Sequence, residues 1–158
     1  MMIPADRVAY YETPNTFLGN EVLSRLIEVG LEATTDAAEA GNCYATGRYT
    51  ACIFHLMRLM EKCVQKMGND LGIPEKITCE KEWQKILNDM KGKIKEKYPS
   101  EKDSERIKLE SVIGHLETVK IAWRNPTMHP KATYTAREAE NIINAVRIFL
   151  EDFSLIII

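Results

Sequence analysis

Apolar residues recur along the chain at the spacing of an α-helix and not at that of a β-strand. One stripe runs through 18–40, where apolar positions are three or four residues apart. We expect this stripe to form one helix of about six turns, followed by a break or kink at Gly41-Asn42. A second stripe, over 49–71, predicts another long helix that ends at Gly72 and Pro74, because glycine caps helices and proline does not continue them.

Three further helices are predicted in the second half of the chain. Weaker apolar spacing predicts one over 81–97, and a clearer stripe predicts the next over 103–123. The last helix follows a Thr-x-x-Glu capping box formed by Thr135 and Glu138, and its apolar stripe reaches Phe153. We find no strand pattern, repeat or linker. The sequence therefore predicts an all-α fold, a bundle of four or five helices.

Length and charge narrow the class of protein. The chain has 158 residues and 45% hydrophobic residues, which indicates one domain over 1–158 with a core roughly over 17–153. Lys plus Arg is 21 and Asp plus Glu is 23, a formal net charge of −2. This balance argues against a protein that coats nucleic acid or a membrane over its whole surface, but it leaves room for one small cationic site.

The four cysteines form no Cys-x-x-Cys pair, so neither a zinc knuckle nor a redox motif is predicted. Cys52 and Cys63 lie eleven residues apart in one predicted helix, about 16 Å along its axis, which is too far for a disulfide. Reduced thiols indicate a cytoplasmic protein. The N-terminus has no signal-peptide pattern, and no apolar run is long enough to span a membrane. From sequence spacing we expect no metal site and no cofactor.

The most informative stretch reads Trp-Arg-Asn-Pro-Thr-Met-His over 123–129. It lies where the fourth helix is expected to break, because a residue before proline is pushed out of the helical region. Two longer blocks accompany it, residues 40–61 and residues 134–139. Together these stretches resemble the HEPN family, all-α domains of which many cut RNA without a metal. The family's hallmark is an Arg followed a few residues later by a His, and Arg124 and His129 match it.

The resemblance implies a metal-independent endoribonuclease of the toxin or phage-defence type. RNA carries its own nucleophile, the 2′-OH, so cleavage needs a base, an acid and stabilisation of the phosphorane charge. Histidine suits either proton-transfer role near neutral pH, so we assign His129 to proton transfer. Arginine binds phosphate through two parallel hydrogen bonds and stays charged, so we assign Arg124 to the phosphate. Asn125 is expected to orient the phosphate or His129.

One histidine cannot serve both proton steps at once. In the family two subunits commonly meet so that two Arg-His motifs face one cleft, which implies a homodimer with RNA as substrate. An antitoxin-like partner protein is a further expectation. Two alternatives stay open: a non-catalytic module that binds a nucleotide or a partner, and a purely structural protein that dimerises through the apolar C-terminal tail, residues 153–158.

The second long helix also carries His55, Arg58 and Glu61, and its residues 55, 58 and 62 form a polar stripe beside the apolar one. Arg58 and Glu61 are three residues apart and can form an ion pair. One interpretation makes this stripe a solvated or interface surface. The other makes Arg58, Glu61 and His55 supporting residues that reach the cleft of Arg124 and His129.

Overall fold

The computed structural model describes residues 1–74, 83–124 and 133–156. Within these ranges all regular structure is helical, which confirms the predicted all-α class. The described α-helices are α1 (Val8–Glu12), α2 (Asn20–Glu28), α3 (Thr34–Ala45), α4 (Tyr49–Asp70), α6 (Trp83–Lys97), α7 (Ser104–Val119) and α9 (Ala136–Ile156). Shorter 3₁₀ turns cover Ala5–Arg7 and Pro14–Thr16, and a π-helical turn covers Lys120–Arg124.

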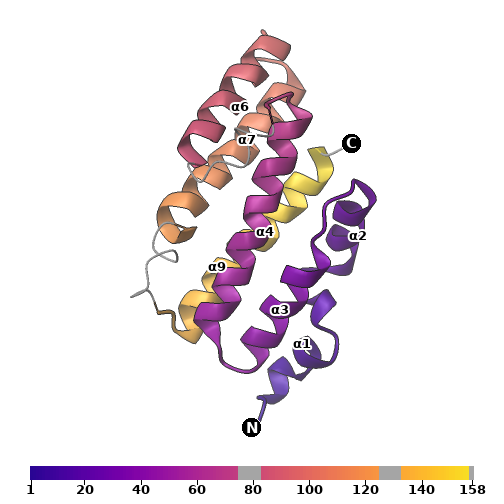
Figure 1. Ribbon diagram of the computed structural model, residues 1–158, viewed down its shortest axis with the longest axis vertical. Coiled ribbons are helices and arrows are strands. Elements are labelled where there is room, and N and C mark those ends of the chain that lie inside the picture. The colour runs from indigo at the N-terminus through magenta and orange to yellow at the C-terminus, as the bar shows by residue number, and fades with distance from the viewer. Residues whose placement is uncertain (75–82, 125–132, 157–158) are drawn as a thin grey trace.

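The two longest helices, α4 and α9, lie side by side along the long axis of the molecule (Figure 1). Helix α3 packs against α4 as a helical hairpin, and α7 packs against α9. Helix α6 packs on α7 at one end, whereas α1 contacts α3 near the N-terminus at the opposite end (Figure 1). Helix α4 thus lies between α3 and α9, and residues 125–132 connect the turn that follows α7 to the segment before α9 along the chain.

The predicted apolar stripes form the core. On α4, the stripe residues Ile53, Leu56, Met60 and Val64 are all buried. On α9, the buried set extends from Ala139 through to Phe153 and Ser154. The apolar side chains of both helices belong to one buried cluster that also includes residues of α2, α3, α6 and α7. Burial of a single face per helix is what the spacing of three and four residues predicts.

The single helix expected over 18–40 was wrong: two helices, α2 and α3, occupy this stretch. The chain turns at Gly30, whose φ of 81° lies in the left-handed region that glycine adopts without strain. The Leu31 N–H donates to the Leu26 carbonyl and the Gly30 N–H to the Ile27 carbonyl, which is the pattern of a glycine C-cap. The apolar stripe continues across this turn, so its spacing gave no sign of the break.

Gly41 does not break a helix as predicted, because it lies inside α3. A Cβ atom at this position would meet the Pro14 carbonyl oxygen at 3.0 Å and the Phe17 Cβ at 3.2 Å. The glycine is therefore needed for the close approach of the segment before α2. At the end of α4 the prediction is confirmed: Gly72 has a φ of 77°, and the Ile73 N–H donates to the Gly68 carbonyl.

The described start of the C-terminal tail is the last turn of α9, which contacts the core through Phe153 and Ser154, both buried. Leu155 remains exposed, and so does Ile148, two turns earlier on the same face of α9. In the described part of the tail, residues 153–156, Leu155 is therefore the one exposed large apolar side chain.

Candidate functional site

The predicted catalytic residues lie at or beyond an edge of the described structure. Arg124 is the last residue of the π-helical turn that continues α7. Asn125 and His129 lie outside the described residues. Turns of π-helix are rare and occur frequently at functional sites, which is consistent with a special role for this helix end.

Hydrogen bonds fix the chain at residues 134–138, which follow the motif in the sequence. The Thr135 N–H donates to Glu138 Oε2 at 2.8 Å, and the Glu138 N–H donates to Thr135 Oγ1 at 3.3 Å. This reciprocal pair is the predicted capping box, which is thereby confirmed. The hydrogen bonds from the Thr135 backbone and hydroxyl lower the pKa of the Glu138 carboxyl below its ordinary value. Just before it, the Tyr134 N–H donates to Thr50 Oγ1 at 3.1 Å and fastens this segment to the first turn of α4.

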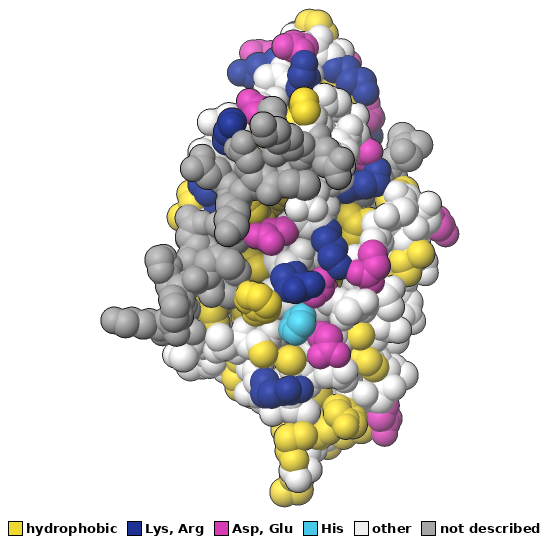
Figure 2. Space-filling model, viewed as in Figure 1, with side chains coloured by type: hydrophobic (Ala, Val, Ile, Leu, Met, Phe, Trp, Pro, Cys, Tyr) yellow, Lys and Arg dark blue, Asp and Glu magenta, His cyan; other side chains and the backbone are white. Residues whose placement is uncertain are grey.

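A buried carboxylate with three basic neighbours lies between α3 and α4. Asp36, in the first turn of α3, is 1% exposed. Its Oδ1 lies 3.1 Å from His55 Nδ1 and accepts a hydrogen bond from Arg58 Nε at 3.0 Å. Its Oδ2 lies 2.9 Å from Lys62 Nζ. The spacing of the three basic residues by three and four places them on one face of α4, opposite α3. On the face shown in Figure 2, basic and acidic side chains gather beside a histidine over these two helices.

The neighbours keep Asp36 ionised although it is buried. Burial is the largest influence on its pKa and raises it, but the hydrogen bonds from Lys62 and His55 and the charge of Arg58 together lower the pKa below the ordinary aspartate value. Lys62 also donates to Glu32 Oε2 at 2.5 Å. The cluster therefore holds two carboxylates and two permanent cations in direct contact, with His55 at its edge.

The polar stripe proposed from the sequence is only partly a solvated surface. His55 and Arg58 both turn onto Asp36, so the stripe is a contact between α3 and α4. Glu61 lines a shallow hollow together with Phe54, Arg58, Lys62 and Gln65. Whether any of these side chains reaches Arg124 and His129 stays a prediction. Sequence reasoning missed Asp36, although the basic residues 55, 58 and 62 on one helix face called for an anion opposite them.

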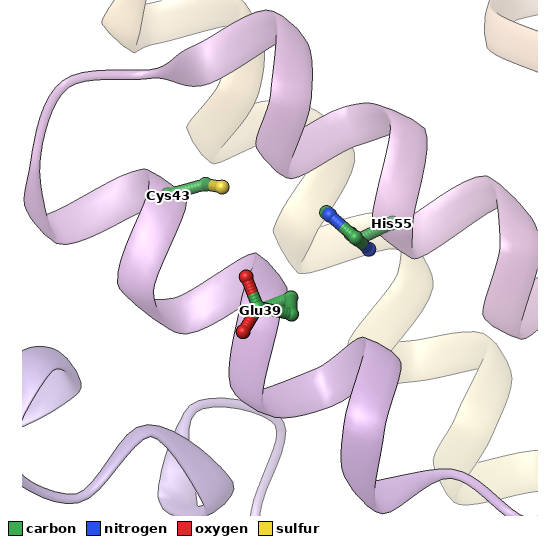
Figure 3. Close-up of side chains that lie close together, drawn as sticks. All are labelled: Glu39, Cys43 and His55. Atoms are coloured by element: carbon green, nitrogen blue, oxygen red, sulfur yellow. The ribbon is translucent and has the colours of Figure 1, made fainter.

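His55 is also part of a second group, which sequence spacing did not indicate. Glu39 and Cys43 of α3 and His55 of α4 each offer one ligand atom, and these atoms all lie within 4.8 Å of one another. Figure 3 shows the three side chains converging from the two helices. Cys43 is buried, Glu39 is exposed and the His55 side chain is 24% exposed. Burial raises the pKa of the Cys43 thiol, and the charge of Arg48 partly offsets the effect.

No family model, curated protein or solved structure matches the chain. In the part of the chain that the structure describes, no helix combines the length and the apolarity needed to cross a membrane.

Proposed function

We propose that this protein is a HEPN-like endoribonuclease that cleaves RNA without a metal ion, with Arg124 and His129 as its catalytic residues. The observation that carries the proposal is the position of the Arg-His motif. The segment that carries the motif connects the π-helical end of α7 to the capped start of α9, and these two helices pack on each other. The hydrogen bond from the Tyr134 N–H to Thr50 also fastens the chain after the motif to α4. A segment that connects two fixed helix ends is a suitable support for catalytic side chains.

In the proposed reaction the 2′-OH of RNA attacks the adjacent phosphate. One histidine takes the proton of the 2′-OH, and a second gives a proton to the departing 5′-oxygen. Arg124 stabilises the negative charge that develops on the phosphorane. The bond from phosphorus to the 5′-oxygen breaks, so the products are a 2′,3′-cyclic phosphate and a 5′-hydroxyl. Asn125 orients the phosphate or His129.

The two proton transfers require two histidines, so the proposed enzyme is a homodimer in which each subunit supplies one His129 to a shared cleft. The exposed Leu155 and Ile148 of α9 are apolar surface available for such a contact. The proposal places the protein in the cytoplasm, where RNA is present and thiols stay reduced. A toxin or defence role, held in check by an antitoxin-like protein, is the setting that the family resemblance suggests.

The test is incubation of the purified protein with labelled RNA in EDTA, followed by analysis of the product ends. We expect cleavage that leaves cyclic phosphate and 5′-hydroxyl ends. His129→Ala and Arg124→Ala should each lower the rate about a hundredfold or more. Their melting curves should stay close to that of the wild type. His115→Ala is the control, because His115 is half-buried on α7 with its Nδ1 3.5 Å from Asp152 of α9. It should lower the melting temperature more than the activity.

Several results would contradict the proposal. Cleavage that EDTA abolishes and Mg²⁺ restores would overturn the metal-independent mechanism. A fully active monomer in light scattering would remove the shared cleft. An inactive wild type that binds a nucleotide or a partner protein through Arg124 would favour the non-catalytic binding module, and an inactive dimer without such binding would favour the structural alternative.

A further inference from the structure

We infer that Glu39, Cys43 and His55 form a binding site for a divalent transition-metal ion of the zinc type, with Asp36 as the residue that orients His55. The site uses none of the proposed cleavage residues Arg124, Asn125 and His129, and it does not depend on their activity.

The backbone places the three ligands suitably. Glu39 and Cys43 are four residues apart on α3, so they lie on one face of that helix, one turn apart. His55 approaches from α4 across the hairpin (Figure 3). Zinc binds sulfur at about 2.3 Å and nitrogen or oxygen at about 2.0–2.2 Å, so ligand atoms around a tetrahedral ion lie roughly 3.3–3.8 Å apart. The ligand atoms lie within 4.8 Å of one another, so the side chains need to close by at most roughly 1–1.5 Å, a change that rotation about their own bonds supplies.

The donor set selects the metal. A thiolate and an imidazole favour zinc, cobalt, nickel or copper, whereas magnesium and calcium prefer oxygen ligands alone. Three protein ligands leave a fourth position for water, as in sites that keep an open coordination position. The exposed Glu39 and the partly exposed His55 form the solvent side of the site, and Cys43 forms its inner end. On binding, the Cys43 thiol gives its proton to solvent and coordinates as the thiolate.

Asp36 prepares His55 for this role. In the metal-bound state His55 Nδ1–H donates to Asp36 Oδ1, the atoms being 3.1 Å apart here, and this leaves the Nε2 lone pair for the ion. Figure 3 shows one ring nitrogen of His55 directed toward Cys43 and Glu39. Because Asp36 is buried and also held by Arg58 and Lys62, its carboxylate is fixed before any ion arrives. A carboxylate, a histidine and a metal in this order are a recurrent arrangement in metalloproteins.

The experiment is a titration of the metal-free wild-type chain with Co²⁺, followed by the thiolate-to-cobalt charge-transfer band and then by displacement with Zn²⁺. We expect one equivalent of Co²⁺ to produce the band and Zn²⁺ to remove it. Cys43→Ser should abolish the band, whereas Cys52→Ser, Cys63→Ser and Cys79→Ser should keep it. Absence of the band in the wild type, or its persistence in Cys43→Ser, would overturn the inference.

Two further variants test the role of Asp36. Asp36→Asn should keep the band but weaken Co²⁺ affinity about 10- to 100-fold, the usual effect of losing such a supporting carboxylate. Lys62→Met is the matched control, because it removes an ion pair of Asp36 and leaves the contact with His55 in place. It should lower the melting temperature with little change in Co²⁺ affinity. Equal losses of affinity in both variants would show that Asp36 acts only through stability.

Discussion

Replacing Asp36 by alanine tests whether the cluster between α3 and α4 stabilises the fold. The variant removes a carboxylate that is 1% exposed and leaves three basic side chains without their common partner. Breaking a fully buried ion pair costs about 3–5 kcal/mol, because the remaining charge has no water around it. An exposed pair is worth only about 0–1 kcal/mol. The burial of the three partners decides where between these two values the loss of stability in Asp36→Ala should lie.

The partners of Asp36 are not equally buried. The Arg58 side chain is 53% exposed and can turn to water, and Lys62 keeps its contact with Glu32. His55 is 24% exposed and loses the partner of its Nδ1. Asp36→Ala should therefore lower the free energy of unfolding by about 2–3 kcal/mol, between the values for an exposed and a fully buried ion pair. This figure includes the loss of an acidic side chain from the first turn of α3. For a chain of this size that corresponds to a fall in melting temperature of roughly 5–10 °C.

Urea denaturation and thermal melting of Asp36→Ala measure this cost. Asp70→Ala is the control, since Asp70 pairs with Lys66 at the other end of α4 and its side chain is 45% exposed. We expect that control to change stability by no more than about 0.5 kcal/mol. If Asp36→Ala were no more destabilising than Asp70→Ala, the cluster would not be a stabilising contact between the two helices.

Two other predictions concern local structure. Gly41→Ala should lower the free energy of unfolding in urea by about 1–3 kcal/mol, because the added Cβ presses on neighbouring backbone. The control is Gly92→Ala, in a helix with open space around the position, which should be neutral or stabilising by up to about 1 kcal/mol. Equal effects of the two variants would refute the packing argument. The Glu138 carboxyl should titrate in NMR below the ordinary glutamate pKa of about 4.3. Since this pKa is lowered in the folded chain, the capping contact stabilises above that pH and is lost as the pH falls through the lowered pKa. Thr135→Ala should raise the Glu138 pKa part of the way back, and an unchanged pKa would contradict the hydroxyl contact.

The apolar pattern predicted the long helices well because each buries one face along its whole length, as α4 and α9 do. It failed at Gly30 and Gly41 for a common reason. Spacing records which side chains face the core, but not the backbone dihedral of a glycine or the distance to a distant segment. At Gly30 the stripe continued across a left-handed turn, and at Gly41 a glycine needed for close packing resembled a helix break.

For the polar residues too, the sequence pattern shows which face of a helix they share but not which residues they contact. His55 and Arg58 stood out because they share one face of a predicted helix, but their partner depends on how α3 packs against α4. Glu39 and Cys43 are four residues apart, which is an ordinary spacing on a helix, and only the third ligand makes the group notable. His55 lies on the other helix of the hairpin, so no local motif contains all three residues.

Helix α4 connects the two proposed sites, because Thr50 holds the segment after the Arg-His motif and His55 lies little more than one turn further on. The connection does not make the metal part of the cleavage chemistry, and the two roles are separable.

Zinc at 100 times its dissociation constant should stabilise the wild type by about 2.7 kcal/mol, since it binds only the folded hairpin. Melting curves should therefore show a rise of roughly 5–10 °C with zinc for the wild type and none for Cys43→Ser. RNA cleavage should be the same for both proteins at a temperature where both are folded. A zinc-dependent rise in Cys43→Ser would place the ion elsewhere, and cleavage lost in Cys43→Ser while it stays folded would join the two sites in one mechanism.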